Sequence, residues 1–310
     1  MFKTTIRIIS LIVLLVLPIG QLLATGAPEQ SLGPSATQPV LDSRGVEISL
    51  GAPPRKIVSL SPNITEILYA LGLGETVVGR TDYCDYPEQV SSVPSMGDLF
   101  TPSIEKIVAS EADLVIISNL GQLQTIEAIE RAGVTVAFLD EPGTMEGTFS
   151  IIRKVGLLTD REEASLALVD SMRQTLEKAR RIVGDGPYPS AYYVAGFGEW
   201  GDFTATGDTY LHEVLTLAGT KNIAADAVNW SYQLELLLAN DPDIIILASM
   251  WGTSFEETRD EFVNHPSYAS LRAVKEGRVI GIQNNLMERQ GPRSADAVLQ
   301  LAERVRSVAR

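Results

Sequence analysis

A helix–strand pattern occurs twice in this chain of 310 residues. Residues 103–118 read SIEKIVASEADLVIIS, and residues 233–248 read QLELLLANDPDIIILA and align with them without a gap. In each segment a glutamate stands near the start of a helical pattern, and an aspartate precedes an apolar run typical of a buried parallel strand. The copies are 130 residues apart, which is too far for a solenoid, so the pattern indicates two related α/β lobes.

The residues around the repeat predict more elements of the same kinds. Lys56–Leu60 reads as a strand that leads into a helix, with Ser61 as its cap and Pro62 at its first position. Further short strands are predicted at 76–79, 113–118, 134–139, 190–196, 243–249 and 277–282. Asp160–Val183 has a long helical pattern, and residues 291–310 form a closing helix. We therefore predict an α/β fold, with two doubly wound α/β lobes joined by a single long helix and a ligand cleft between the lobes.

The predicted boundaries divide the chain into five parts. Residues 1–26 are predicted to be a signal peptide, and residues 27–45, rich in proline, serine and glutamine, a flexible tether. The N-terminal lobe spans 46–158, the connecting helix 159–186 and the C-terminal lobe 187–310.

The N-terminal segment has the features of a secretory signal. Lys3 and Arg7 precede an apolar run from Ile8 to Leu17, and small residues follow. The alternative is a retained membrane anchor, but Pro18 and Gly20 interrupt a run that is already short for a span of about 20 residues. We expect cleavage and a periplasmic or other extracytoplasmic location. Because no cysteine lies near the cut site, a lipoprotein is not expected.

Composition and motifs argue against two broad classes of function. A formal net charge of −14 does not suit a nucleic-acid binder, which needs a basic face for phosphates. The phosphate-loop, dinucleotide-binding and nucleophile-elbow motifs of common enzymes do not occur in the sequence. His212 and His265 are isolated, and the single cysteine, Cys84, would need a spatial neighbour such as His212 to form a catalytic dyad. We predict a binding protein that is not an enzyme, and we expect a monomer without a cofactor of its own.

Aromatic residues gather at the predicted strand ends and helix entries. They are Tyr83, Tyr86, Phe100, Trp200, Phe203, Trp230 and Trp251. Each alone could fill a core between elements, but as a set they predict a cleft for a large, partly apolar ligand, because aromatic faces supply contact area at little entropic cost. Cys84 lies between the two tyrosines in TDYCDYPEQV and is expected to be a packed small residue. A thiolate bound to cobalt or iron is the alternative.

Three stretches together resemble a known family of transport proteins. They are residues 55–90 (RKIVSLSPNITEILYALGLGETVVGRTDYCDYPEQV), residues 103–118 and residues 285–293 (NLMERQGPR). In this order they resemble the periplasmic binding proteins that serve importers of vitamin B12, haem and iron–siderophores, over roughly residues 50–310. DYCDYP and NLMERQGPR are most similar to the cobalamin-binding branch.

The resemblance implies a function and its partners. Such proteins have two α/β lobes bridged by a rigid helix, capture a metal-chelate nutrient and hand it to a membrane permease of the ABC type. A glutamate on each lobe docks onto arginines of the permease, and by position these are Glu105 and Glu235, the glutamates of the repeat. The alternative is that each glutamate only favours its helix dipole.

The cobalamin branch also implies ligand contacts. Tyr86 or Tyr83 and Trp230 would stack on a corrinoid, and Asn285 and Arg289 would contact its polar edge. The branch often has an acid at the position of Asn285, which leaves open a different corrinoid or another chelate.

Rival functions stay open at this point. On the same scaffold, haem would use Tyr83 or Tyr86 as an iron ligand, and a ferric siderophore would use Arg289 and Arg293. Asn119 stands where a large aromatic is expected and is a second departure from the branch. From other classes, a two-lobed metallocluster enzyme would need clustered Cys or His ligands, and a sensor or adhesion module would be tethered at the cell surface.

Overall fold

The computed structural model describes residues 37–118, 121–249 and 253–308, with the side chain of Trp200 left out. The predicted signal peptide, residues 27–36 of the predicted tether, Asn119 and Trp251 lie outside this described part. No helix of the described part is both long and apolar enough to cross a membrane.

The first sheet has four parallel strands. In spatial order they are β4 (Val77–Arg80), β3 (Ile57–Ser59), β5 (Leu114–Ser118) and β6 (Val136–Leu139). The helices of this part are α1 (Pro62–Ala70), η1 (Gly74–Thr76), η2 (Glu88–Ser92), α2 (Ile104–Ala109), α3 (Leu123–Arg131) and α4 (Met145–Leu158). β5 is buried along its whole length, as its apolar run predicts.

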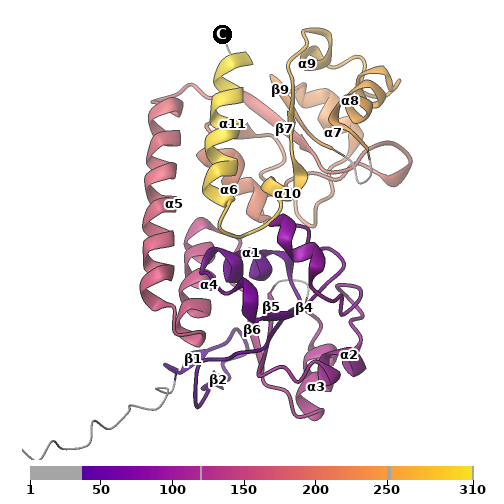
Figure 1. The fold of residues 1–310 in the computed structure, drawn as a ribbon. Helices are drawn as coiled ribbons and strands as arrows, with labels where there is room; N and C mark the ends of the chain where they lie inside the picture. Colours follow the sequence, from indigo (N-terminus) through magenta and orange to yellow (C-terminus); the bar gives the residue numbers. More distant parts are fainter. Residues whose placement is uncertain (1–36, 119–120, 250–252, 309–310) are drawn as a thin grey trace, which may run out of the picture. The chain divides into compact units, whose positions relative to one another are not determined.

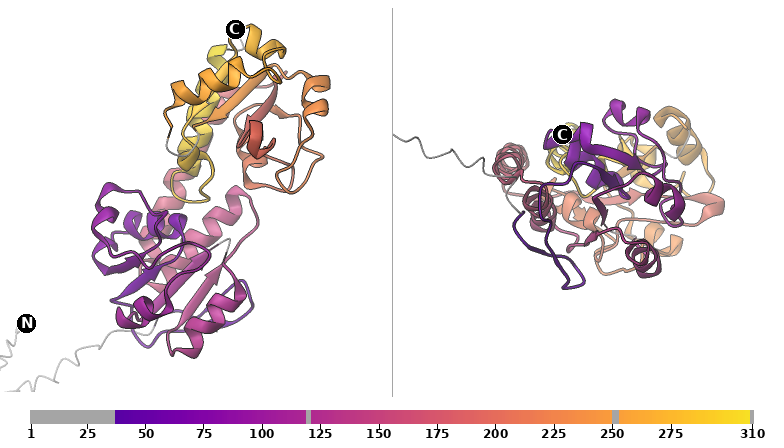
Figure 2. Two further views of the ribbon diagram at one scale, coloured as in Figure 1. Left: turned by 90° about the vertical axis from the view of Figure 1, so that its right-hand side faces the viewer. Right: turned by 60° about the horizontal axis from the view of Figure 1, so that its bottom comes forward.

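The second sheet has the same plan, again with four parallel strands. In spatial order they are β10 (Val279–Ile282), β9 (Ile244–Ala248), β7 (Ser190–Val194) and β8 (Lys221–Asn222). Its helices are η3 (Gly198–Trp200), α6 (Tyr210–Leu217), α7 (Leu234–Asn240), α8 (Phe255–Asn264), α9 (Arg272–Lys275), α10 (Asn284–Met287) and α11 (Ser294–Val308). Figure 2 shows that the earlier residues, indigo to magenta, build one sheet and the later residues the other, so each lobe is a continuous part of the chain.

The internal repeat corresponds to α2–β5 in the first lobe and α7–β9 in the second. In both copies the aspartate ties the start of its strand to the start of the neighbouring strand. Asp113 accepts hydrogen bonds from the backbone N–H groups of Arg55 (2.7 Å) and Lys56 (2.9 Å), at the start of β3. Asp243 accepts one from the N–H group of Ser190 (2.9 Å), at the start of β7. These bonds explain why the sequence has an aspartate at this point in both copies.

The long helix predicted between the sheets is α5 (Glu162–Val183). Glutamates stand in its first turn and arginines in its last, which suits the helix dipole, and Gly184, with φ of 66°, follows its end. Its buried face includes Val169, Met172 and Ala179. The helix packs against α4 of the first lobe and along α11 of the second (Figure 1). α5 therefore joins the two lobes, as predicted.

Two local predictions are corrected by the structure. Ser61 occupies the N-cap position of α1, but its hydroxyl accepts a hydrogen bond from the backbone N–H of Ser118 (2.9 Å) and none from the helix. The serine thus fixes the end of β5 beside the start of α1. The predicted tether, 27–45, includes β1 (Val40–Leu41), which pairs with β2 (Glu47–Ile48) because one apolar side chain of each strand is buried in the core.

Candidate functional site

The loop after β4 carries the two tyrosines that the sequence predicts in the site. Cys84, between them, is buried, and the hydroxyl of Thr65 donates a hydrogen bond to its sulfur (3.1 Å). Cys84 is therefore a packed residue, as predicted, and it anchors the loop to α1. Tyr83 is partly buried, and its hydroxyl lies 3.4 Å from a carboxylate oxygen of Asp98. Tyr86 is 46% exposed.

A network of ion pairs and hydrogen bonds joins this loop and α1 to α10 and the segment that follows it. Its members, which we call the lobe-junction cluster, are Glu66, Asp85, Asn285, Arg289 and Arg293. Arg293 donates to Glu66 from Nε to Oε2 (2.8 Å) and from Nη2 to Oε1 (2.6 Å). Nη1 of Arg289 donates to Glu66 Oε1 (3.0 Å) and to Asp85 Oδ1 (2.5 Å). Nδ2 of Asn285 donates to Asp85 Oδ2 (2.5 Å).

The two tyrosines adjoin this cluster. Nη2 of Arg289 donates a hydrogen bond to the carbonyl oxygen of Tyr83 (3.0 Å). The guanidinium of Arg293 stacks over the ring of Tyr86, 4.0 Å from its centroid. The structure thus brings together Tyr83, Tyr86, Asn285 and Arg289.

The cluster is buried at its centre and balanced in charge. The side chain of Glu66 is 1% exposed, and those of Arg289 and Arg293 are mostly buried. Burial alone would lower the pKa of Arg293, but the hydrogen bonds and charge of Glu66, with smaller contributions from Tyr86 and Asp85, raise that pKa above its usual value. Two carboxylates face two guanidinium groups, so each arginine has an acidic partner within the protein.

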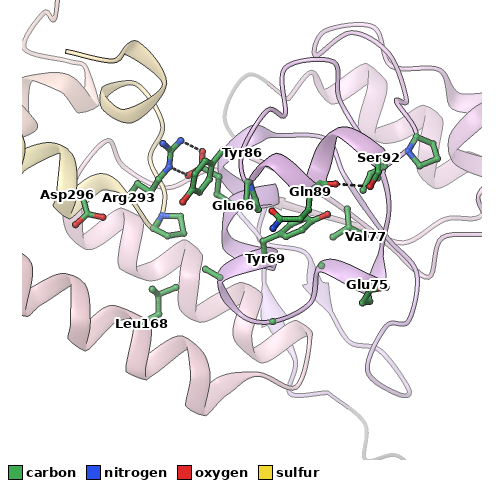
Figure 3. Close-up of a pocket in the computed structure, with 17 residues that line it drawn as sticks. Glu66, Tyr69, Glu75, Val77, Tyr86, Gln89, Ser92, Leu168, Arg293 and Asp296 are labelled. Atoms are coloured by element: carbon green, nitrogen blue, oxygen red, sulfur yellow. Dashed lines mark hydrogen bonds and ion pairs between the residues drawn. The ribbon is translucent and has the colours of Figure 1, made fainter. Parts of the chain in front are cut away.

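A pocket of about 860 Å³ opens beside the cluster. Its lining includes Glu66, Tyr69, Tyr86, Leu168, Arg293 and Asp296, which Figure 3 draws as sticks. In that view the Glu66–Arg293 pair and the ring of Tyr86 lie together at one side of the pocket. The volume falls within the range of about 300–1,000 Å³ that is usual for sites of small molecules.

Two aromatic residues of the second lobe lie near the carboxyl end of β7. Phe203 pairs with Gly196, which follows β7, and with Ser231, which follows Trp230. Trp230 is 39% exposed, and Phe203 is also exposed. Phe100, in the first lobe, is also exposed and lies on a loop.

Two predicted contact residues lie partly or wholly outside the described residues. Trp200 lies on η3, but its side chain is outside the described part, and Trp251 is outside it altogether. Within the residues that the structure describes, no group of three or more His, Cys, Asp or Glu side chains could hold a metal ion.

Sequence reasoning missed Glu66 and Asp85. Glu66 lies on α1 among buried residues such as Ile64 and Ile67, and an acid on the buried face of a helix is a signal that could have marked it. Asp85 is exposed and had no such signal, because its partners Asn285 and Arg289 are 200 and 204 residues away in the sequence.

The two glutamates of the repeat lie in the first turns of their helices, Glu105 on α2 and Glu235 on α7, and both are exposed. Apolar side chains on the same helices are exposed too, namely Val108 on α2 and Leu236 and Leu238 on α7. Acidic and apolar groups side by side on an exposed helix suit contact with another protein.

Comparison with known proteins gives concordant matches. A family model described as periplasmic binding protein matches residues 57–286. The uncharacterized ABC transporter substrate-binding lipoprotein YvrC of Bacillus subtilis is 30% identical over 272 residues, which cover 85% of this chain and 84% of YvrC. The vitamin B12-binding protein of Photorhabdus laumondii is 27% identical over 260 residues, which cover 83% of this chain and 90% of that protein. Among solved structures, the periplasmic heme-binding protein RhuT from Roseiflexus sp. RS-1 superposes with a TM-score of 0.75 at 26% identity, and the match covers 83% of this chain and 99% of RhuT.

Proposed function

Because the chain belongs to the periplasmic binding protein family, we propose that it is the exported substrate-binding protein of an ABC importer and that its ligand is cobalamin or a related corrinoid. The protein captures the ligand and delivers it to a membrane permease, without catalysis. The single observation that carries the choice of ligand is the charge balance of the lobe-junction cluster.

A ligand beside Tyr86 meets arginines that already have partners. Arg293 is paired with Glu66, and Arg289 with Glu66 and Asp85. An anionic ligand that pulled an arginine away would leave Glu66 buried without its partner, and breaking a buried pair costs about 3–5 kcal/mol. Haem carries two propionates, whereas the corrin ring carries mainly amide groups. The cluster therefore favours the amide-rich ligand.

The amide groups of a corrin need hydrogen-bonding partners rather than net charge, and its flat ring needs aromatic faces. Asn285 and the phenol groups of Tyr83 and Tyr86 supply donors and acceptors. The exposed rings of Tyr86 and Trp230 supply flat surfaces for the apolar face of a corrin. Phe100, Trp200 and Trp251 complete the proposed lining.

Haem is the second candidate. The exposed phenol of Tyr86 is a suitable iron ligand, and RhuT, a heme-binding protein by name, has a similar fold. A ferric siderophore on the same scaffold would instead need Arg289 and Arg293 to leave their acidic partners.

Delivery requires a docking surface and export. We assign docking to Glu105 and Glu235, each with the exposed apolar residues of its helix. Cleavage of residues 1–26 would release a monomer that shuttles ligand to the permease. YvrC is a lipoprotein by name, and the only cysteine of the given sequence is Cys84.

Titration of purified residues 27–310 tests the choice of ligand. Cyanocobalamin, haemin and a ferric hydroxamate are added separately, and tryptophan fluorescence and the visible absorbance of each ligand are followed. We expect cyanocobalamin to bind about tenfold tighter than the others, or more. Tight binding of haemin alone would reject the corrinoid and keep the importer role, and binding of none of the three would leave the ligand proposal without support.

A further inference from the structure

The backbone that presents Trp230 has an unusual conformation. Asn229 and Trp230 have φ of 60° and 61°, in the left-handed region that residues other than glycine rarely adopt. Such a conformation costs on the order of 1–3 kcal/mol per residue, although asparagine tolerates it better than most. For a bulky tryptophan it persists only when the surrounding structure imposes it.

Asp208 and Thr206 impose this conformation from the preceding loop. The carboxylate of Asp208 accepts a hydrogen bond from the backbone N–H of Asn229 (3.0 Å), and the hydroxyl of Thr206 accepts one from the N–H of Trp230 (3.0 Å). The same hydroxyl donates its hydrogen to the other carboxylate oxygen of Asp208 (2.6 Å), so it acts as an acceptor toward the N–H of Trp230. These bonds, first that from Thr206 and then that from Asn229, also lower the pKa of Asp208.

The loop that holds Trp230 is itself fixed to the second sheet. Thr204 donates from its hydroxyl to the carbonyl oxygen of Tyr193 on β7 (2.6 Å), and its backbone N–H donates to the carbonyl oxygen of Trp230 (2.9 Å). Gly207 donates from its N–H to the carbonyl oxygen of Ala227 (3.1 Å). The backbone N–H and the carbonyl oxygen of Trp230 are therefore both hydrogen-bonded, to Thr206 and Thr204, and Thr204 is bonded to β7.

We propose that Asp208, acting with Thr206, is a positioning residue that holds the Trp230 side chain as a fixed aromatic wall of the ligand site. The proposal rests on the proposed function and deepens it. Trp230 is 39% exposed on a strained backbone, and backbone strain of this kind clusters at sites where a residue has a function. A ring fixed before binding loses little conformational entropy when the ligand stacks on it, which strengthens binding.

The test measures the motion of Trp230 and the affinity separately. The chain has three tryptophans, so a parent with Trp200→Phe and Trp251→Phe reports on Trp230 alone. Asp208→Ala is compared with Asp226→Ala, which removes the same charge from an exposed position close to Trp230 in the sequence. Asp208→Asn keeps one acceptor oxygen and serves as the conservative variant, also where Asp208→Ala does not fold.

In Asp208→Ala we expect faster local rotation of Trp230 in time-resolved fluorescence anisotropy without ligand, and cyanocobalamin binding weaker by on the order of tenfold. Asp208→Asn should give a rotation rate and an affinity between those of the parent and those of Asp208→Ala. Asp226→Ala should give the parent's values for both. Unchanged anisotropy in Asp208→Ala, with or without a loss of thermal stability, would overturn the proposal, as would faster rotation with the parent's affinity. An unsubstituted protein, with all three tryptophans, that binds none of cyanocobalamin, haemin and ferric hydroxamate would count against the proposed function. The anisotropy of the single-tryptophan variants would still decide whether Asp208 positions the ring.

Discussion

Glu66 on α1 and Arg293 before α11 form a two-bond ion pair between residues 227 apart in the sequence. A second arginine, Arg289, shares the same carboxylate. The pair therefore ties the first helix of the first lobe to the last segment of the second. The contact between the lobes and the proposed ligand site therefore share one buried acid.

Replacing Glu66 by glutamine should reduce the free energy of unfolding by about 3 kcal/mol, because Arg289 and Arg293 lose the carboxylate that compensates their buried charge. Urea unfolding at neutral pH measures the change. Glu75→Gln is the control, since Glu75 lines the same pocket but is exposed, and it should change stability by less than about 0.5 kcal/mol. Equal effects of the two variants would mean that burial of Glu66 does not matter.

Replacing Asp85 by asparagine should shift ligand preference without a large loss of stability. Asp85 is exposed, and its replacement removes one of the two carboxylates that form ion pairs with Arg289, so the cluster gains one net positive charge. Haemin should bind several-fold tighter than to the unchanged protein, because an added positive charge favours propionates by about 1 kcal/mol when water screens the two charges. Titration with haemin measures this, and Asp82→Asn in the same loop is the control. A haemin affinity that rises equally in the control would point to a general charge effect.

Asp42 should make stability depend on pH. Burial alone would raise the pKa of Asp42, but hydrogen bonds from the Arg44 side chain and from the N–H groups of Val46 and Arg44 lower it below the usual value. The stabilisation is therefore present above about pH 4, the usual pKa of an unfolded aspartate, and is lost as the pH falls through the lower, folded value.

Asp42→Asn should consequently cost about 2 kcal/mol at pH 7 and progressively less below pH 4. Chemical unfolding at pH 7 and at the lowest pH at which the protein stays folded gives the two values. Glu47→Gln, at an exposed position of β2, should change the free energy of unfolding by the same amount at both pH values. A cost for Asp42→Asn that is the same at both pH values would contradict the ionic origin of its contribution.

Gly207 should not accept a side chain. A Cβ atom there would overlap the carbonyl oxygen of Ala225, which is backbone and cannot rotate away. Gly207→Ala should thus destabilise the protein by about 2 kcal/mol or more, whereas Gly51→Ala, with open space around its Cβ, should be neutral or slightly stabilising. Thermal unfolding of both variants checks this. A stable Gly207→Ala protein would show that the loop around Trp230 shifts easily.

The parts of the fold that were predictable from the sequence are those with a local cause. The repeat was visible because an aspartate and an apolar run must be adjacent to tie one parallel strand to the next, as Asp113 and Asp243 do. The length of α5 followed from its own periodicity and the glycine after it. By contrast, the hydroxyl of Ser61 bonds to Ser118, 57 residues away, so its local pattern predicted the wrong partner.

The candidate site was predictable only in part, for the same reason. Tyr86 and Trp230 could be singled out because aromatic residues gather at the predicted strand ends and helix entries, and Arg289 because its segment resembles the cobalamin-binding branch. The role of Glu66 depends on two arginines more than 220 residues later, which no periodicity indicates. The left-handed backbone of Trp230 depends on hydrogen bonds from another loop and leaves no trace in the residue type.

Docking to the permease should depend on the two glutamates of the repeat. In Glu105→Ala with Glu235→Ala, ligand affinity should stay unchanged, because both residues lie on helices outside the lobe-junction cluster. Uptake of labelled cobalamin by cells that carry the variant should fall by about tenfold or more, because each lost ion pair with a permease arginine weakens the complex.

A matched control separates docking from the helix dipole. Glu163→Ala with Glu256→Ala removes an exposed glutamate from the first turn of α5 and of α8, so it makes the same change in charge and in helix-dipole interaction elsewhere. Both double variants should lose a similar, small amount of thermal stability, but only the first should lose uptake. If uptake fell equally in both, or if the first variant bound cobalamin more weakly, Glu105 and Glu235 would not be docking residues.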